Sequence, residues 1–194
     1  MDNKLNKVLE AIDEINAQDP NLEVSEGEKI PKELLYGQRM SAALKAFHEN
    51  ASEILQIAAR GQHIRRWDIP RSDYPMDRKG YLQWRTQLKM MHASIIEEIM
   101  KKHSYSEGEI KIAKDLLMKK GLKSNRDAQT LEDVICLVFL KYYIDDFAKG
   151  KEEDKMISIL QKTWGKMSEN GHKAAQRLSL SSETSTLVSK ALSA

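Results

Sequence analysis

Three residues on apolar, helix-like stretches have the side chains of a metal site: His63, His92 and Asp133. His63 follows Leu55 at a distance of eight residues, and His92 lies four residues after Leu88, so both histidines share a helical face with apolar residues. Asp133 opens the most apolar stretch of the chain, where an unpaired carboxylate would be costly to bury. Two imidazoles and one carboxylate leave coordination positions open for water and a phosphate oxygen. This spacing predicts one divalent metal held by His63, His92 and Asp133, with His63 and Asp133 as the catalytic candidates.

Each of these residues also has a structural interpretation. A histidine on an apolar face is commonly a hydrogen-bonded core residue, because buried polar groups need partners. An acid in the first turn of a helix commonly caps it, favoured by the helix macrodipole. Asp133 could also pair with an arginine. The sequence leaves these alternatives open.

Residues 60–85 form a stretch rich in arginine and aromatic side chains around His63. It holds six of the nine arginines and two of the three tryptophans, and its seven basic and three acidic residues give +4, against +2 for the whole chain. Arginine grips phosphate with a planar fork and stacks on aromatic rings. We therefore expect a phosphate-containing small molecule as the ligand. The predicted binding residues are Arg60, Arg65, Arg66, Trp67, Arg71, Arg85 and, from a later basic loop, Lys120 and Lys123.

The same stretch has two alternative interpretations. Its arginines could pair with neighbouring acids and brace the loop that Pro70 and Pro75 predict over residues 67–76. It could also bind a nucleotide or RNA without catalysis, with a base stacked on Trp67 or Trp84. The near-neutral charge of the whole chain argues against a general polyanion binder.

The elements that must position these residues are predicted to be helices. Apolar residues recur at helical spacing over residues 3–17, 31–47, 52–64, 77–102 and 106–121. The stretch 134–140 is apolar all round, which predicts a central buried helix at about 131–148. Further helices are expected up to residue 178, and no strand pattern is found. The fold class is therefore predicted to be all-α, as a single compact helical domain.

The predicted organisation is an N-terminal helix and linker at 1–30, a helical core domain at 31–178 and a Ser/Thr-rich, weakly helical tail at 179–194. Helix ends are predicted from cap residues: Ser52, Ser106 with Glu109, Gly121 and Thr130.

The composition indicates in which cellular compartment the protein is expected. The single cysteine, Cys136, excludes an internal disulfide and is expected to be a buried, inert thiol in a reducing compartment. The first residues lack the apolar segment of a signal peptide, and the longest apolar run is far shorter than the ~20 residues that span a bilayer. We expect a cytoplasmic protein that does not interact with a membrane.

The strings AARGQHIRRWDIPR, YPMDR, GYLQWR, KKGLK and LEDVICLVFL, with the spacing between them, resemble the uncharacterised domain-of-unknown-function family four-two-zero-two over nearly the whole chain. More weakly, the order of His63, His92 and Asp133 resembles the HD superfamily of metal-dependent phosphohydrolases. That resemblance implies an HD-like helical bundle, a divalent metal (Fe, Mn, Zn, Co or Mg) and hydrolysis of a nucleotide or another phosphorylated small molecule. Two positions depart from the HD pattern, because Ile64 replaces the aspartate of the His-Asp pair and Met40 stands where a first histidine is expected.

Overall fold

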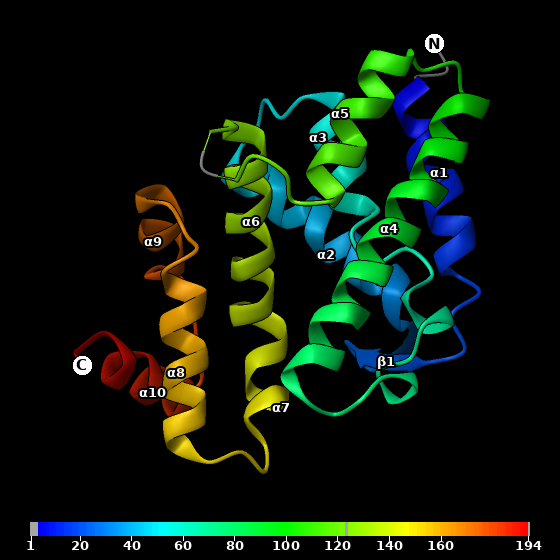
Figure 1. The fold of residues 1–194 in the computed structure, drawn as a ribbon. Coiled ribbons are helices and arrows are strands. Elements are labelled where there is room, and N and C mark those ends of the chain that lie inside the picture. Colours follow the sequence, from blue (N-terminus) through cyan, green and yellow to red (C-terminus); the bar gives the residue numbers. More distant parts are fainter. Residues whose placement is uncertain (1–3, 123, 194) are drawn as a thin grey trace. The chain divides into compact units, whose positions relative to one another are not determined.

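The computed structural model describes residues 4–122 and 124–193, which group into two compact units with a boundary after Gly121 (Figure 1). Helices dominate both units, so the predicted all-α class is confirmed. The predicted boundaries at 30/31 and 178/179 stay predictions. Each terminal helix packs against other helices of its own unit.

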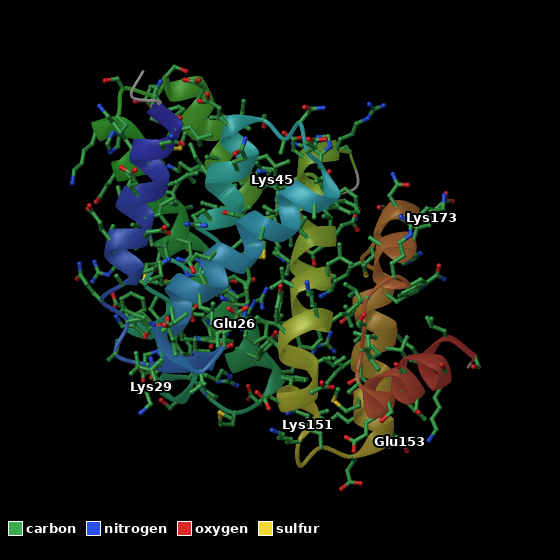
Figure 2. All side chains as sticks on the ribbon, turned by 180° about the vertical axis from the view of Figure 1, so that it is seen from behind. Glu26, Lys29, Lys45, Lys151, Glu153 and Lys173 are labelled. Atoms are coloured by element: carbon green, nitrogen blue, oxygen red, sulfur yellow. The ribbon has the colours of Figure 1, made fainter. Side chains whose placement is uncertain are left out.

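The described part of the first unit contains five α-helices, two short 3-10 helices and a hairpin. In chain order these are α1 Lys4–Asn16, β1 Leu22–Ser25, β2 Glu28–Pro31, α2 Lys32–Phe47, α3 Glu53–Arg60, the 3-10 helices Arg66–Asp68 and Arg71–Asp73, α4 Arg78–Lys102 and α5 Glu107–Leu117. The short helix α3 is central, because it packs against α1, α2 and α5, while α4 packs against α1 and α5. The core contains Ile12, Met40, Ile57, Ile64 and Ile96, all fully buried. Charged side chains such as Lys29 and Lys45 point outward (Figure 2).

Residues 22–31, expected to be a loop, form an antiparallel hairpin in which Leu22 pairs with Pro31. Its two turn residues, Glu26 and Gly27, have φ of 51° and 86°, as a tight hairpin turn requires. Four-residue strands are too short to give a clear alternation of apolar and polar residues, which explains why the sequence pattern did not indicate them.

The predicted helix starts at Ser52 and Ser106 are confirmed. Ser52 accepts a hydrogen bond from the Leu55 backbone N–H, and Ser106 with Glu109 forms a complete capping box. Two predicted caps are wrong. α5 ends at Leu117, before the predicted glycine, in a Schellman motif in which Lys119 adopts the left-handed conformation at φ 57°. The cap of α6 is Asn125 rather than Thr130.

The second unit is built on α6 Arg126–Val138, which continues through a π-helical turn, Phe139–Tyr143, into α7 Ile144–Ala148. This confirms the buried helix predicted at about 131–148. The unit is completed by α8 Glu153–Trp164, α9 Glu169–Ala175 and α10 Ser182–Ser193. α9 packs on α6, and α10 packs on α7 and α8.

The Ser/Thr-rich end is a helix rather than a weakly helical tail. In α10, Thr184 and Ala191 are buried, and the hydroxyl groups of Ser181 and Thr184 donate to Asp145. Packing against neighbouring helices therefore compensates for the low helix propensity of serine and threonine. None of the helices in the described ranges is long and apolar enough to cross a membrane.

Candidate functional site

The centre of the candidate site is His63, which follows α3 and meets two residues of α2. The His63 ring stacks on Tyr36 with centroids 3.8 Å apart and planes 11° apart, and its Nδ1 lies 3.1 Å from Oε2 of Glu33. Glu33 and Tyr36 are three positions apart on α2, so the same face of that helix presents both. Only 21% of the His63 side chain and 7% of the Glu33 side chain are exposed, so this contact is largely shielded from water.

His92 brings a second imidazole to this site from α4. Its ring centroid lies 6.2 Å from that of His63, and the residue is 4% exposed. Its Nε2 is buried and has no hydrogen-bond partner within the described part of the chain. A buried polar atom without a partner is unfavourable by about 1–3 kcal/mol. Nε2 of His92 is therefore the atom that a bound ligand would satisfy.

Arg66 contacts His63, and the positive charge of Arg85 acts on both histidines. Nη1 of Arg66 lies 3.4 Å from both ring nitrogens of His63, and its guanidinium group is 5.1 Å from the Trp84 ring. Arg85 lies seven residues before His92 on α4, which places both on one side of that helix. The candidate site thus combines two imidazoles, two guanidinium groups and the carboxyl group of Glu33.

Burial and charge set the ionisation of the site. Burial, reinforced by the positive charges of Arg66 and Arg85, holds the pKa of His63 and of His92 well below the usual histidine range. Burial also raises the pKa of Glu33 to about 7, against the opposing effect of Arg66 and Lys32. Near neutral pH both imidazoles are therefore uncharged, and Glu33, with a pKa of about 7, is partly protonated.

Two of the predicted ligand-binding arginines are engaged by the protein itself. Arg60 grips Asp13 on α1 with two hydrogen bonds, one of them 2.7 Å from Nε to Oδ1. Arg71 donates to the backbone carbonyl groups of Tyr74 and Pro75 at 2.9 and 2.7 Å. These contacts agree with the bracing interpretation of the stretch.

The remaining predicted ligand-binding residues are more varied. Arg65 is half exposed and pairs with Asp68 at 2.6 Å. Trp67 is partly buried. Trp84 is 7% exposed and donates from Nε1 to the Ile69 carbonyl group at 2.8 Å, which leaves little of its surface for a base. Lys120 is exposed and pairs with Asp115 at 2.9 Å, and Lys123 lies outside the described residues.

Asp133, the third predicted metal ligand, belongs to the second unit. Its carboxylate accepts hydrogen bonds from the backbone N–H and the hydroxyl group of Ser168, at 2.7 and 2.6 Å, and from Gln129 at 3.2 Å. These bonds tie α6 to the start of α9, where Ser168 is the N-cap. The structure places His63 and His92 close together in the first unit, and the metal ligation by Asp133 stays a prediction. Within the described ranges, no group of three or more His, Cys, Asp or Glu side chains is arranged to hold a metal ion.

Glu33 and Tyr36 were not predicted as site residues. Glu33 lies shortly after Pro31 in the first turn of a helix. An acid is common there because it interacts favourably with the helix macrodipole, so its presence does not by itself indicate a site. A signal was nevertheless present, because Glu33, Gly37, Met40 and Leu44 recur at steps of four, three and four, which puts an acid on the buried face of α2.

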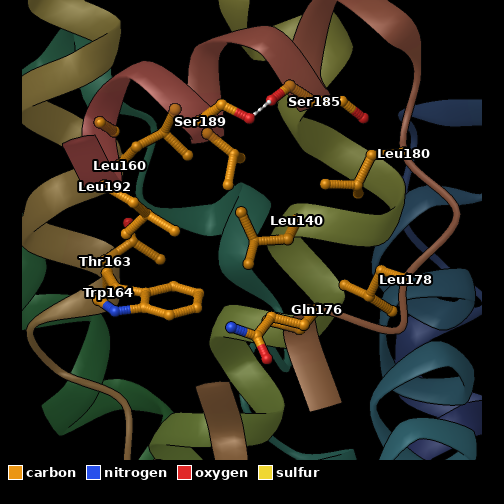
Figure 3. A pocket seen from close by; sticks show the side chains of 13 residues that line it. Leu140, Leu160, Thr163, Trp164, Gln176, Leu178, Leu180, Ser185, Ser189 and Leu192 are labelled. Carbon is orange, nitrogen blue, oxygen red and sulfur yellow. Dashed lines mark hydrogen bonds between the residues drawn. The ribbon is translucent and has the colours of Figure 1, made fainter. Parts of the chain in front are cut away.

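The second unit contains an apolar pocket of about 210 Å³ (Figure 3). No charged side chain is among the described residues that line it, and Trp164, which forms one wall, stacks on His172 with centroids 3.9 Å apart. The lining includes Leu140, Leu160, Leu178, Leu180 and Leu192. This pocket lacks acid–base groups, so the first unit provides the better candidate for chemistry.

Comparison with known proteins agrees with the sequence strings described above. No curated protein and no solved structure matches the chain. The implied HD-like bundle and its metal site therefore stay predictions. A family model described as "Domain of unknown function (DUF4202)" matches residues 6–188. The chain therefore belongs to the DUF4202 family.

Proposed function

We propose that this protein is a phosphohydrolase that acts on a phosphorylated small molecule, such as a nucleotide, at the site formed by His63 and His92. The observation that carries the proposal is the buried Nε2 of His92, which has no hydrogen-bond partner among the described residues and belongs to a ring close to that of His63, which Arg66 contacts. Arginine guanidinium groups match the geometry and the charge of phosphate oxygens. We assign phosphate binding to Arg66 and Arg85, because Arg60 and Arg71 are already held by protein groups.

Glu33 and His63 provide the acid–base pair of the proposed reaction. The carboxyl group of Glu33 contacts Nδ1 of His63, an arrangement in which a carboxylate orients an imidazole and stabilises its protonated form. The opposite nitrogen, Nε2, could then take a proton from an attacking water molecule. The proton then passes through the imidazole to Glu33, whose pKa of about 7 suits a general base at neutral pH, because a general base works best when its pKa lies near the working pH.

The role of a metal ion is part of the test. The sequence predicts one divalent ion, and an added ion would polarise the phosphate and lower the pKa of a bound water molecule. The assay is therefore run with a panel of nucleotides and sugar phosphates, with and without Mn²⁺, Mg²⁺ or Co²⁺, on untagged protein. Phosphate release is the readout.

Two variants and a matched control make the assay specific. His63→Ala and His92→Ala should each lower phosphate release by 100-fold or more, the scale of losing a general acid–base group. His48→Ala should leave release unchanged, because His48 is an exposed histidine of the same unit at the end of α2. A wild-type protein that releases no phosphate from any compound, with or without metal, would sink the proposal.

The alternative is a module that binds a nucleotide or RNA through residues 60–85 without catalysis. The exposed side of this stretch, with Arg65 and the partly buried Trp67, favours it. Two observations argue against it, because Trp84 is buried and Arg71 donates its hydrogen bonds to the protein backbone. Nucleotide binding by the wild-type protein, retained in His63→Ala and without turnover, would support this alternative over hydrolysis.

A further inference from the structure

The unsatisfied atom of the site has a chemical preference. A neutral imidazole has one N–H donor and one acceptor nitrogen, and Nε2 of His92 is buried without a partner for either role within the described residues. A metal ion would bind this nitrogen as an acceptor, whereas an anion would accept a hydrogen bond from it as a donor. The surrounding charges decide between the two.

The fixed charges near the histidines are positive and close. The guanidinium group of Arg66 lies 3.4 Å from each ring nitrogen of His63, so a cation bound to His63 would lie close to a permanent positive charge. Arg85 adds a second charge that acts on both rings, and the carboxyl group of Glu33, with its pKa raised to about 7, offsets only part of this positive charge near neutral pH. Repulsion between like charges is strong at such distances in a shielded site. The arrangement around His63 and His92 therefore does not fit a divalent metal ion as a resident ligand.

The same charges fit an anion with two negative charges. Arg66 and Arg85 carry two positive charges, which a phosphate monoester dianion would neutralise and a singly charged diester would not. A phosphate oxygen could also accept a hydrogen bond from Nε2 of His92, for which the described part of the chain supplies no partner. We propose that the site binds the terminal phosphate group of a monoester directly through Arg66, Arg85 and His92, without a metal ion. This inference rests on the proposed function, since it names the substrate class of the same site.

The probes are inorganic phosphate, phenyl phosphate as a monoester and dimethyl phosphate as a diester. Their affinities are measured by isothermal titration calorimetry on the full chain in the presence of EDTA. Inorganic phosphate and phenyl phosphate should bind, and dimethyl phosphate should bind at least tenfold more weakly. Tighter binding of phenyl phosphate than of inorganic phosphate would support a monoester as the natural ligand. Tighter binding of inorganic phosphate would overturn that assignment in favour of free phosphate.

Variants separate this site from a general surface effect. Arg66→Gln and Arg85→Gln should each weaken phosphate binding tenfold or more, whereas Arg78→Gln, an exposed arginine at the start of α4, should not change it. His92→Leu should abolish binding and yet melt at the same temperature as the wild-type protein or higher, because it removes a buried polar atom that has no partner. A purely structural histidine would show the opposite, a lower melting temperature.

The outcomes distinguish this inference from the proposed function. Phosphate binding in EDTA without turnover of any compound supports the inference even though the hydrolase proposal fails. Phosphate release that requires Mn²⁺, together with no phosphate binding in EDTA, overturns the inference and leaves the hydrolase proposal standing. Equal binding of the diester, or unchanged binding in Arg66→Gln and His92→Leu, also overturns it.

Discussion

At the scale of single residues, the first unit separates two uses of arginine that the sequence could not distinguish. Arg60 donates its hydrogen bonds to the carboxylate of Asp13, and Arg71 donates to backbone carbonyl groups. Arg66 instead lies against the His63 ring and over Trp84. Some arginines of residues 60–85 therefore hold the protein structure together, and others are candidates for ligand binding.

Replacing Arg60 tests the bracing role. Arg60→Lys should lower the free energy of unfolding by about 1–2 kcal/mol, because lysine cannot reproduce the two-pronged contact with Asp13. A double-mutant cycle with Asp13→Asn, followed by urea denaturation, measures the coupling. Phosphate affinity should be unaffected. A tenfold loss of phosphate binding with unchanged stability would assign Arg60 to the ligand instead.

The buried carboxyl group of Glu33 should make stability depend on pH. Its pKa rises from 4.5 to about 7 on folding, so its favourable contribution is complete below about pH 4.5 and is lost as the pH rises towards 7. Glu33→Gln removes this dependence. The variant should gain stability relative to wild type by up to roughly 3 kcal/mol between about pH 5 and about pH 8. Urea denaturation at both pH values checks this, and an equal difference at both would contradict it.

At the scale of elements, the sequence predicted some local features of the helix ends, although two predicted caps were wrong, and it did not predict the long-range contacts. The capping box of Ser106 and Glu109 and the start of α4 at Asp77 depend on residues three positions apart, so the sequence was sufficient to predict them. The contact of Glu33 with His63 joins residues 30 positions apart, and that of Asp133 with Ser168 joins residues 35 apart. Such pairings depend on how helices pack, which periodicity does not encode.

The junction of α6 and α9 offers a test of packing around Asp133. A Cβ atom added to Gly171 would lie 2.5 Å from Oδ1 of Asp133, so Gly171→Ala should lower the stability by about 1–3 kcal/mol. Gly108→Ala is the matched control, because its Cβ would meet nothing closer than 4.0 Å in an exposed part of α5. That control should stabilise the protein by up to about 1 kcal/mol. Thermal denaturation compares both, and equal effects would contradict the close packing.

At the scale of the whole molecule, the helical class could be predicted and the grouping into units could not. Helical periodicity is present in every long segment, so the fold class followed from the pattern of apolar residues. The division after Gly121 reflects which helices share a core, and α1 and α4 share one although they are remote in sequence. The grouping of Asp133 with His63 and His92 stays a prediction.

The net charge of the chain predicts how strongly it binds nucleic acid. A charge of +2, with several basic residues already paired within the protein, should give only weak, salt-sensitive binding to RNA. A titration with tRNA at low salt and at about 0.15 M salt should show binding, if any, at low salt alone. Tight binding that persists at the higher salt would favour the RNA-binding alternative over a small phosphorylated substrate.

The most direct test of the central claim is phosphate release from phosphorylated small molecules by wild-type protein, His63→Ala and the matched control His48→Ala. The account predicts release by the wild-type protein and by His48→Ala, and a loss of 100-fold or more in folded His63→Ala. No release by the wild-type protein under any metal condition, or undiminished release by His63→Ala, would contradict it.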